Sequence, residues 1–174
     1  FFGLVGAGRS EIMRAIFGVD KFQSGKVFVD GKEVKIYNPV KAVRQGIALV
    51  PEDRKLEGLS LRLSVLFNMT LVKIRQINRL GVIDKKAQKS EAETYVQRTR
   101  VKTPNLAQKV YHLSGGNQQK VVISKWLMMN PQILILDEPT RGIDVAAKAE
   151  IYGLISDQAN AGVCVLVVSS EIPE

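Results

Sequence analysis

A run of four apolar residues followed by two acids, "ILILDE" at residues 133–138, constrains the fold of this chain more than any other stretch. An uninterrupted apolar strand of this kind is typical of the centre of a parallel sheet, where helices cover both faces. Two neighbouring carboxylates at the end of such a strand lose their hydration, which costs free energy unless they bind a partner. We therefore take Asp137 as a candidate Mg²⁺ ligand and Glu138 as the group that orients or deprotonates an attacking water.

Patterns on either side of this run predict alternating strands and helices. Two further apolar runs, "IALV" at 47–50 and "VCVLVV" at 163–168, have the length of buried strands. A helix is predicted to begin at Asp144, a candidate N-cap, and the dipeptide Asp30-Gly31 predicts a β-hairpin. The alternation predicts an α/β fold with a mostly parallel sheet flanked by helices, and ligands at the carboxyl ends of its strands.

The stretch "GLVGAGRS", Gly3 to Ser10, has the form of a phosphate-binding loop. It fits the pattern G-x-x-x-x-G-K-[ST] at every fixed position except one, where Arg9 replaces lysine. Glycines let backbone N–H groups converge on phosphate oxygens, the next helix adds its positive N-terminus, and Ser10 could bind Mg²⁺. A tight strand-to-helix turn without a ligand is the alternative that the residues leave open.

A second anion-binding stretch lies farther along the chain, in "LSGGNQQK" at residues 113–120. It supplies a hydroxyl, two glycines and the predicted start of an amphipathic helix, which together form a nest for an anion. A single phosphate loop needs no second nest in its own site. The stretch therefore suggests a phosphate that a partner presents.

Length and composition limit the class of protein. The chain has 174 residues, enough for one globular domain, and its 45% apolar and 24% charged residues exclude a disordered or collagen-like chain. No apolar run approaches the roughly 20 residues that span a bilayer. The single Cys164 lies in an apolar run, which predicts a buried thiol and a reducing compartment. Because the chain starts without Met, at what we expect to be the end of a strand, we interpret it as a piece of a longer protein.

The middle of the chain, about residues 61–120, differs from the flanking αβ portions at 1–60 and 121–174. After a polar loop at 53–61, helical patterns predominate and strand signals disappear, which predicts an inserted helical subdomain. The net charge is +8, and basic residues are concentrated in this middle. Such a distribution fits nucleic acid, an anionic membrane surface or bound phosphates, and equally a solvated helical face.

These motifs resemble, in order and spacing, those of the ATP-binding cassette (ABC) ATPases, and the resemblance covers essentially the whole chain. It implies a P-loop NTPase fold of the ABC type, with ATP and Mg²⁺ as cofactors. Gly3–Ser10 would be the Walker A loop, Leu113–Gln118 the signature motif and Gly142–Asp144 the D-loop, with Asp137 and Glu138 as the Walker B acid and catalytic glutamate. Two cassettes would pair head to tail, each ATP lying between one Walker A loop and the partner's signature motif.

The resemblance assigns binding roles position by position. The residues implied to bind nucleotide are Gly3, Gly6, Ala7, Gly8, Arg9, Ser10, Glu11, Glu52, Ser114, Gly115, Gly116, Asn117 and Ser170. The residues implied to bind Mg²⁺ are Ser10, Glu52 and Asp137.

A narrower resemblance comes from "GLVGAGRSE", "LSGGNQQK" and "LDEPTRGIDV". They are similar to the second of the two cassettes in bacterial monosaccharide importers of the ribose, xylose, arabinose and galactose type. This implies an ATPase that drives sugar import through a membrane permease, at the cytoplasmic face of the inner membrane, with a periplasmic sugar-binding protein as an indirect partner. The helical middle would then contact the permease, so we expect no nucleic acid partner, although a soluble ABC protein acting on nucleic acid is an alternative.

Three positions depart from the general family pattern. Arg9 replaces the Walker A lysine, Glu52 stands at the Q-loop glutamine, and Ser170 at the switch histidine. Arginine is a broad planar fork and cannot simply reuse a lysine's place between phosphates. Because Glu138 is retained, we expect a real but slowed nucleotide site. The alternative is a degenerate cassette that binds ATP and completes the partner's site without hydrolysing its own.

Overall fold

Strand β6 (Ile133–Asp137) lies between β3 (Ile47–Val50) and β7 (Cys164–Val168) in a three-stranded parallel sheet. The structure, a computed structural model, describes residues 1–3, 7–22, 24–79 and 81–170. Leu136 pairs with Val50 on one side and Val167 on the other, and Asp137 pairs with Val168, so the three strands end together at the first of the two acids. The predicted central position of the apolar run is therefore confirmed.

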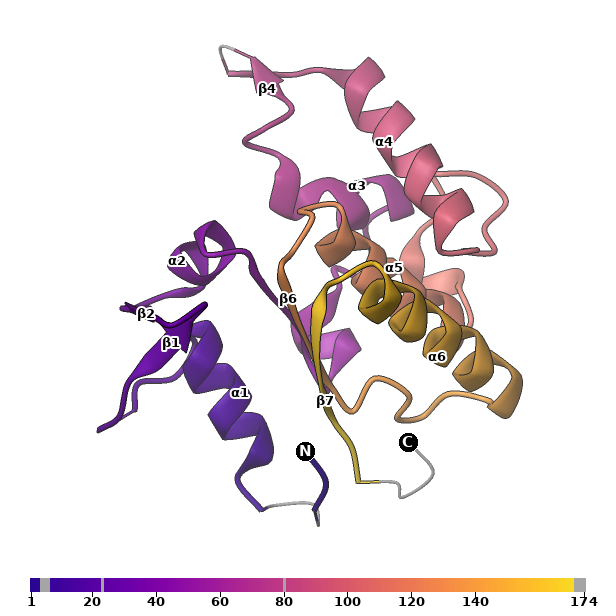
Figure 1. Ribbon diagram of the computed structural model, residues 1–174. Coiled ribbons are helices and arrows are strands. Elements are labelled where there is room, and N and C mark those ends of the chain that lie inside the picture. The colour runs from indigo at the N-terminus through magenta and orange to yellow at the C-terminus, as the bar shows by residue number, and fades with distance from the viewer. Residues whose placement is uncertain (4–6, 23, 80, 171–174) are drawn as a thin grey trace.

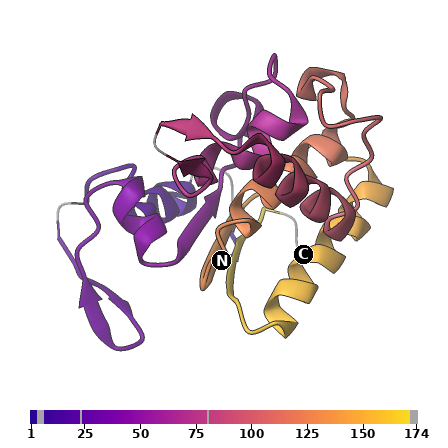
Figure 2. The same ribbon diagram turned by 90° about the horizontal axis from the view of Figure 1, so that it is seen from above.

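Helices cover both faces of this sheet (Figure 1). Helices α1 (Arg9–Phe17) and α2 (Pro39–Arg44) lie on one side of β6 and β7, and α5 (Gly115–Leu127) and α6 (Val145–Asn160) lie on the other. The view from above shows the same two layers with the strands between them (Figure 2). This arrangement buries β6 on both faces, as its uninterrupted apolar sequence requires.

Local signals placed several elements correctly. Strands β1 (Val27–Val29) and β2 (Lys32–Val34) form the predicted antiparallel hairpin. Its two turn residues, Asp30 and Gly31, have φ of 49° and 75°, as a two-residue hairpin turn requires. At the start of α6, the side chain of Asp144 accepts a hydrogen bond from the backbone of Ala147 at 2.9 Å, which confirms the predicted N-cap.

The described residues in the middle of the chain are mainly helical, but they also form a short hairpin that contradicts the expectation of no strands. It contains α3 (Val65–Thr70), the 3₁₀ turn η2 (Leu71–Lys73), α4 (Lys85–Arg98) and the 3₁₀ turn η3 (Val110–His112). Between η2 and α4, β4 (Asn78–Arg79) pairs antiparallel with β5 (Val82–Ile83). This hairpin is too short to produce a period-two apolar pattern, and it turns where Gly81 adopts φ of 87° and donates to the side chain of Asn78.

Two other expectations were wrong. The stretch predicted as a polar loop contains a π-helical turn, η1 (Arg54–Gly58), which the Asp53 carboxylate caps by accepting from two backbone N–H groups. Cys164 is exposed rather than buried, because it opens β7 before that strand enters the core. No helix within the described ranges is long and apolar enough to cross a membrane.

Candidate functional site

The first residues of the chain lie at the carboxyl edge of the sheet. Phe1 and Phe2 run beside the end of β7: the Phe1 amino group donates to the Val167 carbonyl at 2.7 Å, and Ser169 N–H donates back to Phe1 at 3.1 Å. Gly8 then caps α1 in the left-handed region, with φ of 78°, a conformation that favours glycine. The predicted binding residue Gly6 lies outside the described residues.

Asp137 and Ser10 form the part of the site suited to a cation. Asp137 is 3% exposed, and burial raises the pKa of its carboxyl group, although a hydrogen bond with the Ser10 side chain opposes the shift. One carboxylate oxygen of Asp137, Oδ1, is buried without a hydrogen-bond partner among the described residues. A buried carboxylate oxygen that lacks a donor is costly, so this atom is suited to bind a cation.

The donor set around Asp137 fits Mg²⁺ in particular. Within the described part of the chain, no group of three or more His, Cys, Asp and Glu side chains could hold a metal ion by itself. Mg²⁺ needs no such group, because it is commonly held by one or two protein oxygens together with substrate phosphates and water. The Ser10 hydroxyl and the Asp137 carboxylate are two such oxygens. They line a cavity of about 190 Å³ that Glu52 also borders.

Glu138 is held in a strained backbone conformation directly after β6. Its φ of 46° lies in the left-handed region, which is unusual for a residue with a side chain. Its N–H donates to the Val168 carbonyl at 2.9 Å, which extends the pairing with β7 by one residue. The side chain is 8% exposed, and its Oε2 accepts a hydrogen bond from the Ser170 hydroxyl at 3.0 Å. The turn thus directs the carboxylate to a fixed place at the edge of the sheet.

The guanidinium of Arg9 reaches the same carboxylate from the start of α1. Its Nη2 lies 3.4 Å from Glu138 Oε1, and its Nη1 donates to the Ser169 carbonyl. The planar fork of arginine makes this double contact possible, whereas an ammonium group is a single compact charge. Two of the positions that depart from the family pattern, Arg9 and Ser170, therefore meet at the candidate catalytic glutamate.

Glu52, the third departing position, makes a different contact. It borders the cavity beside Ser10 and Asp137, but its carboxylate forms an ion pair with Arg141. Two residues on, Arg54 donates to the backbone carbonyls of Arg141 at 2.9 Å and Gly142 at 3.3 Å. These contacts fasten the segment after β3 to the turn after β6.

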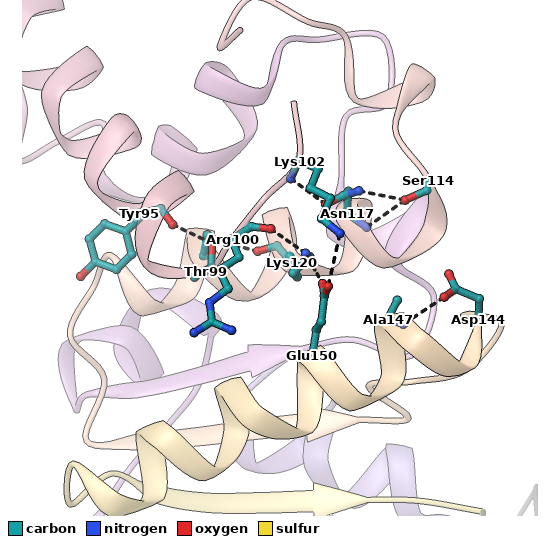
Figure 3. A network of polar contacts seen from close by, with 11 residues as sticks. Tyr95, Thr99, Arg100, Lys102, Ser114, Asn117, Lys120, Asp144, Ala147 and Glu150 are labelled. Atoms are coloured by element: carbon teal, nitrogen blue, oxygen red, sulfur yellow. Dashed lines mark hydrogen bonds and ion pairs between the residues drawn. The ribbon is translucent and has the colours of Figure 1, made fainter. Parts of the chain in front are cut away.

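The second predicted anion site lies at the start of α5. Ser114 caps the helix by accepting from Asn117 N–H, and Gly115 and Gly116 form its first turn rather than a separate turn before it. A Cβ on Gly116 would lie 2.4 Å from the Cβ of Ala147, so α5 and α6 approach too closely for a side chain there. The exposed Ser114 hydroxyl and the Asn117 amide lie together at this helix start (Figure 3).

The predicted residues thus form two groups. Arg9, Ser10, Asp137, Glu138 and Ser170 contact one another at the carboxyl edge of the sheet. Ser114 to Asn117 lie at the start of α5, on the side of the sheet opposite α1, and none of their described hydrogen bonds reaches the first group (Figure 2). Gly3 and Ala7 precede α1 and Glu11 lies in its first turn, and the side chain of Arg9 passes Gly3.

Sequence reasoning missed several polar residues that support these two groups. Arg54 and Arg141 hold the segment around Glu52, and Lys120 forms an ion pair with Glu150 although only 1% of Lys120 is exposed. A charged residue among the apolar positions of a helix was the one available signal for Lys120. Its partner could not be read from the sequence, because it lies 30 residues away.

Comparisons with known proteins identify the family to which the chain belongs. The family model described as ABC transporter matches residues 1–141. Similar relatives are a ribose import ATP-binding protein from Rhodopirellula baltica and a xylose import ATP-binding protein from Thermoanaerobacter pseudethanolicus. Each is 48% identical over 99% of this chain but only 34% of its own length, so the chain spans about a third of these relatives.

Solved structures extend the likeness to the whole fold. A dimeric ATP-binding cassette, MJ0796, in a post-hydrolysis state bound to ADP and Pi, has 25% identity and a TM-score of 0.79, covering 99% of this chain and 74% of that one. A cassette named cbiO1 from Clostridium perfringens has 24% identity and a TM-score of 0.76, covering 98% and 66%, and supports the fold alone. The chain therefore belongs to the ABC transporter family, as an ATP-binding cassette domain of the P-loop type.

Proposed function

We propose that this cassette binds ATP with Mg²⁺ at its own phosphate loop and hydrolyses it to drive import of a monosaccharide through a membrane permease. The observation that carries the proposal is the orphaned Oδ1 of buried Asp137, beside the Ser10 hydroxyl and one residue before Glu138. The proposed cation ligand Asp137 and the proposed base Glu138 are thus neighbours at the place where the loop and the first turn of α1 can bind phosphates.

Each residue of the first group has a distinct part in this proposal. Ser10 and Asp137 would hold Mg²⁺, which neutralises charge on the phosphates and on the leaving group. The N–H groups after Gly8 and the positive end of α1 receive phosphate oxygens. Glu138 accepts the proton of the attacking water, and its contacts with Arg9 and Ser170 fix the orientation of its carboxylate.

The second group would serve a partner cassette. Ser114 to Asn117 lie on the far side of the sheet from α1, so the anion that they are suited to bind is not the one at this chain's own loop. Head-to-tail pairing with a second cassette would bring a partner's ATP to the start of α5. The structure of the MJ0796 cassette bound to ADP and Pi is likewise that of a dimer.

The names of the relatives guide our proposal for the transported sugar and the cellular location. Two of them are named for the import of ribose and xylose, and we infer that this chain is the second cassette of a longer importer ATPase. The remaining partners would be permease subunits and, through them, a periplasmic sugar-binding protein, with the cassette at the cytoplasmic face of the bacterial inner membrane. Nothing in these comparisons supports the alternative of a cassette that binds ATP without hydrolysing it.

Replacing the candidate base tests the proposal directly. In the full-length protein assembled with its permease, Glu138→Gln keeps the shape of the side chain but removes its capacity to accept a proton. We expect hydrolysis at this chain's own site to fall by about 10²–10⁴-fold while ATP binding persists, so that steady-state hydrolysis by the whole protein loses the share of this site. The matched control is Glu93→Gln on the outer face of α4, which should leave hydrolysis unchanged. Unchanged hydrolysis in Glu138→Gln would refute catalysis at this site.

A further inference from the structure

One residue, Asn117, occupies both hydrogen-bond acceptor positions of the Ser114 hydroxyl group. Its Oγ accepts from Asn117 Nδ2 at 2.9 Å and from the Asn117 backbone N–H at 3.4 Å. A serine hydroxyl has two acceptor lone pairs and one donor hydrogen. What remains to Ser114 is therefore its O–H, for which the described residues supply no acceptor. Because Ser114 is exposed, this donor is free to reach an outside group.

The orientation of the Asn117 amide is fixed from the other side. Asn117 Oδ1 accepts a hydrogen bond from the backbone N–H of Lys102 at 2.8 Å (Figure 3). A backbone N–H is only a donor, so the amide oxygen has to face Lys102. The NH₂ group must then face Ser114. A flipped amide would bring two donors together at Lys102.

The backbone that supplies this N–H is itself anchored to α5 and α6. Lys120 Nζ donates to the Arg100 carbonyl at 2.6 Å and to Glu150 Oε2 at 2.7 Å. The other carboxylate oxygen of Glu150 lies 3.4 Å from Lys102 Nζ. The hydrogen bond from Lys120 lowers the pKa of Glu150, so the carboxylate is charged at neutral pH. Residues 100–102 are thereby held against both helices.

We propose that Asn117 is a positioning residue that makes the Ser114 hydroxyl an obligate hydrogen-bond donor to a phosphate oxygen at the start of α5. The inference rests on the proposed function, which places that phosphate on the ATP of a partner cassette. Terminal phosphate oxygens are acceptors at neutral pH, so a hydroxyl with only its hydrogen available matches them. A hydroxyl that turned its lone pairs outward would repel the same oxygens.

An isosteric substitution reverses the direction of this hydrogen bond. In Asn117→Asp, one carboxylate oxygen still accepts from Lys102 N–H, but the other can only accept from Ser114 and draws the O–H inward. In the full-length protein with its permease, we expect kcat/KM for ATP at the partner cassette's site to fall by about 100-fold, and by about 10-fold in Asn117→Ala, which frees the hydroxyl to rotate. The matched control is Asn160→Asp at the exposed end of α6, which should leave kcat/KM unchanged.

A double-mutant cycle with Ser114→Ala separates positioning from other roles. If Asn117 acts through the hydroxyl, Asn117→Ala lowers kcat/KM in the wild-type background and has little further effect once Ser114 is alanine. Equal fold-changes in both backgrounds would overturn the inference, because Asn117 would then act on the fold or on the nucleotide directly. Thermal unfolding of each variant is measured alongside. If Asn117→Ala lowers the thermal unfolding midpoint, Asn117→Asp replaces it in the cycle. A fold-change in kcat/KM for Asn117→Asp that is equal in the wild-type and Ser114→Ala backgrounds would likewise overturn the inference.

The same measurements distinguish this inference from the proposed function. A large loss in Ser114→Ala with additive effects of Asn117→Ala rejects only the positioning role. No loss in Ser114→Ala rejects both the use of this helix start by a partner's ATP and the positioning role. Loss of hydrolysis in Glu138→Gln depends on neither residue and tests this chain's own site separately.

Discussion

The close approach of α5 and α6 at Gly116 gives a quantitative prediction. In Gly116→Ala, the new Cβ would lie 2.4 Å from the Cβ of Ala147, and the contact must open by about 1 Å to reach an ordinary 3.4 Å. Overpacking of this kind costs about 1–3 kcal/mol. Alanine recovers at most about 1 kcal/mol through its higher helix propensity. We therefore expect the free energy of unfolding to fall by up to about 2 kcal/mol.

A matched substitution in α6 isolates the steric part of this effect. A Cβ on Gly153 would meet nothing within 4 Å, so Gly153→Ala should gain helix propensity without a clash and stabilise the helix by up to about 1 kcal/mol. The opposite signs of two Gly→Ala substitutions in neighbouring helices are the core of the prediction. Native-state hydrogen exchange of α5 and α6 peptides in the full-length protein measures both free energies.

Removing the opposing methyl group tests the cause directly. Ala147→Gly deletes the atom that the new Cβ would strike, so it should be less costly in the Gly116→Ala background than alone. A Gly116→Ala variant whose α5 is as stable as before would refute the steric clash. An equal cost of Ala147→Gly in both backgrounds would refute it too, because the two positions would then not be in contact.

Two further predictions concern buried lysines. Lys125 Nζ donates to the Gly58 carbonyl, and burial lowers the pKa of Lys125 to about 8 from an ordinary 10.5. The folded state therefore loses this proton at a lower pH than the unfolded state does. The free energy of unfolding should consequently rise from about pH 8 to about pH 10.5. Urea unfolding across that range checks the rise, and Lys125→Met should flatten it; a flat wild-type profile would contradict the assignment. Lys120→Met leaves the Arg100 carbonyl and Glu150 without their partner, and should lower the free energy of unfolding by about 2–4 kcal/mol. Glu150→Gln should also lower the free energy of unfolding in the same assay, by about 1–3 kcal/mol, because it leaves the buried Lys120 ammonium without its counter-ion, and an unchanged stability would be incompatible with this account.

The parts of the site that the sequence predicted are those with a local cause. Asp137 ends the five-residue strand β6 after four apolar residues. Ser10 comes after the glycines of the loop and lies in the first turn of α1. The N-cap roles of Ser114 and Asp144 also follow from residues only three positions apart. Such signals depend on short-range geometry, which the sequence carries directly.

The contacts that the sequence did not predict join segments far apart in the chain. Arg9 contacts Glu138 across 129 positions, and Lys102 donates to Asn117 across 15 positions. The family resemblance implied Glu52 as a Mg²⁺ ligand, but no pattern in the sequence indicated its pairing with Arg141. That pairing depends on how the segment after β3 and the turn after β6 meet at the edge of the sheet.

The sequence by itself determined the class of fold and indicated the kind of chemistry, because the apolar strand, the glycine loop and the acids at the strand end each have a physical cause at short range. The tertiary structure alone decided how these residues are held. It set Arg9 and Ser170 against Glu138, left one oxygen of Asp137 without a donor among the described residues, and brought α5 against α6 at Gly116. These outcomes depend on which surfaces pack together, and packing is a property of the whole chain rather than of any stretch within it.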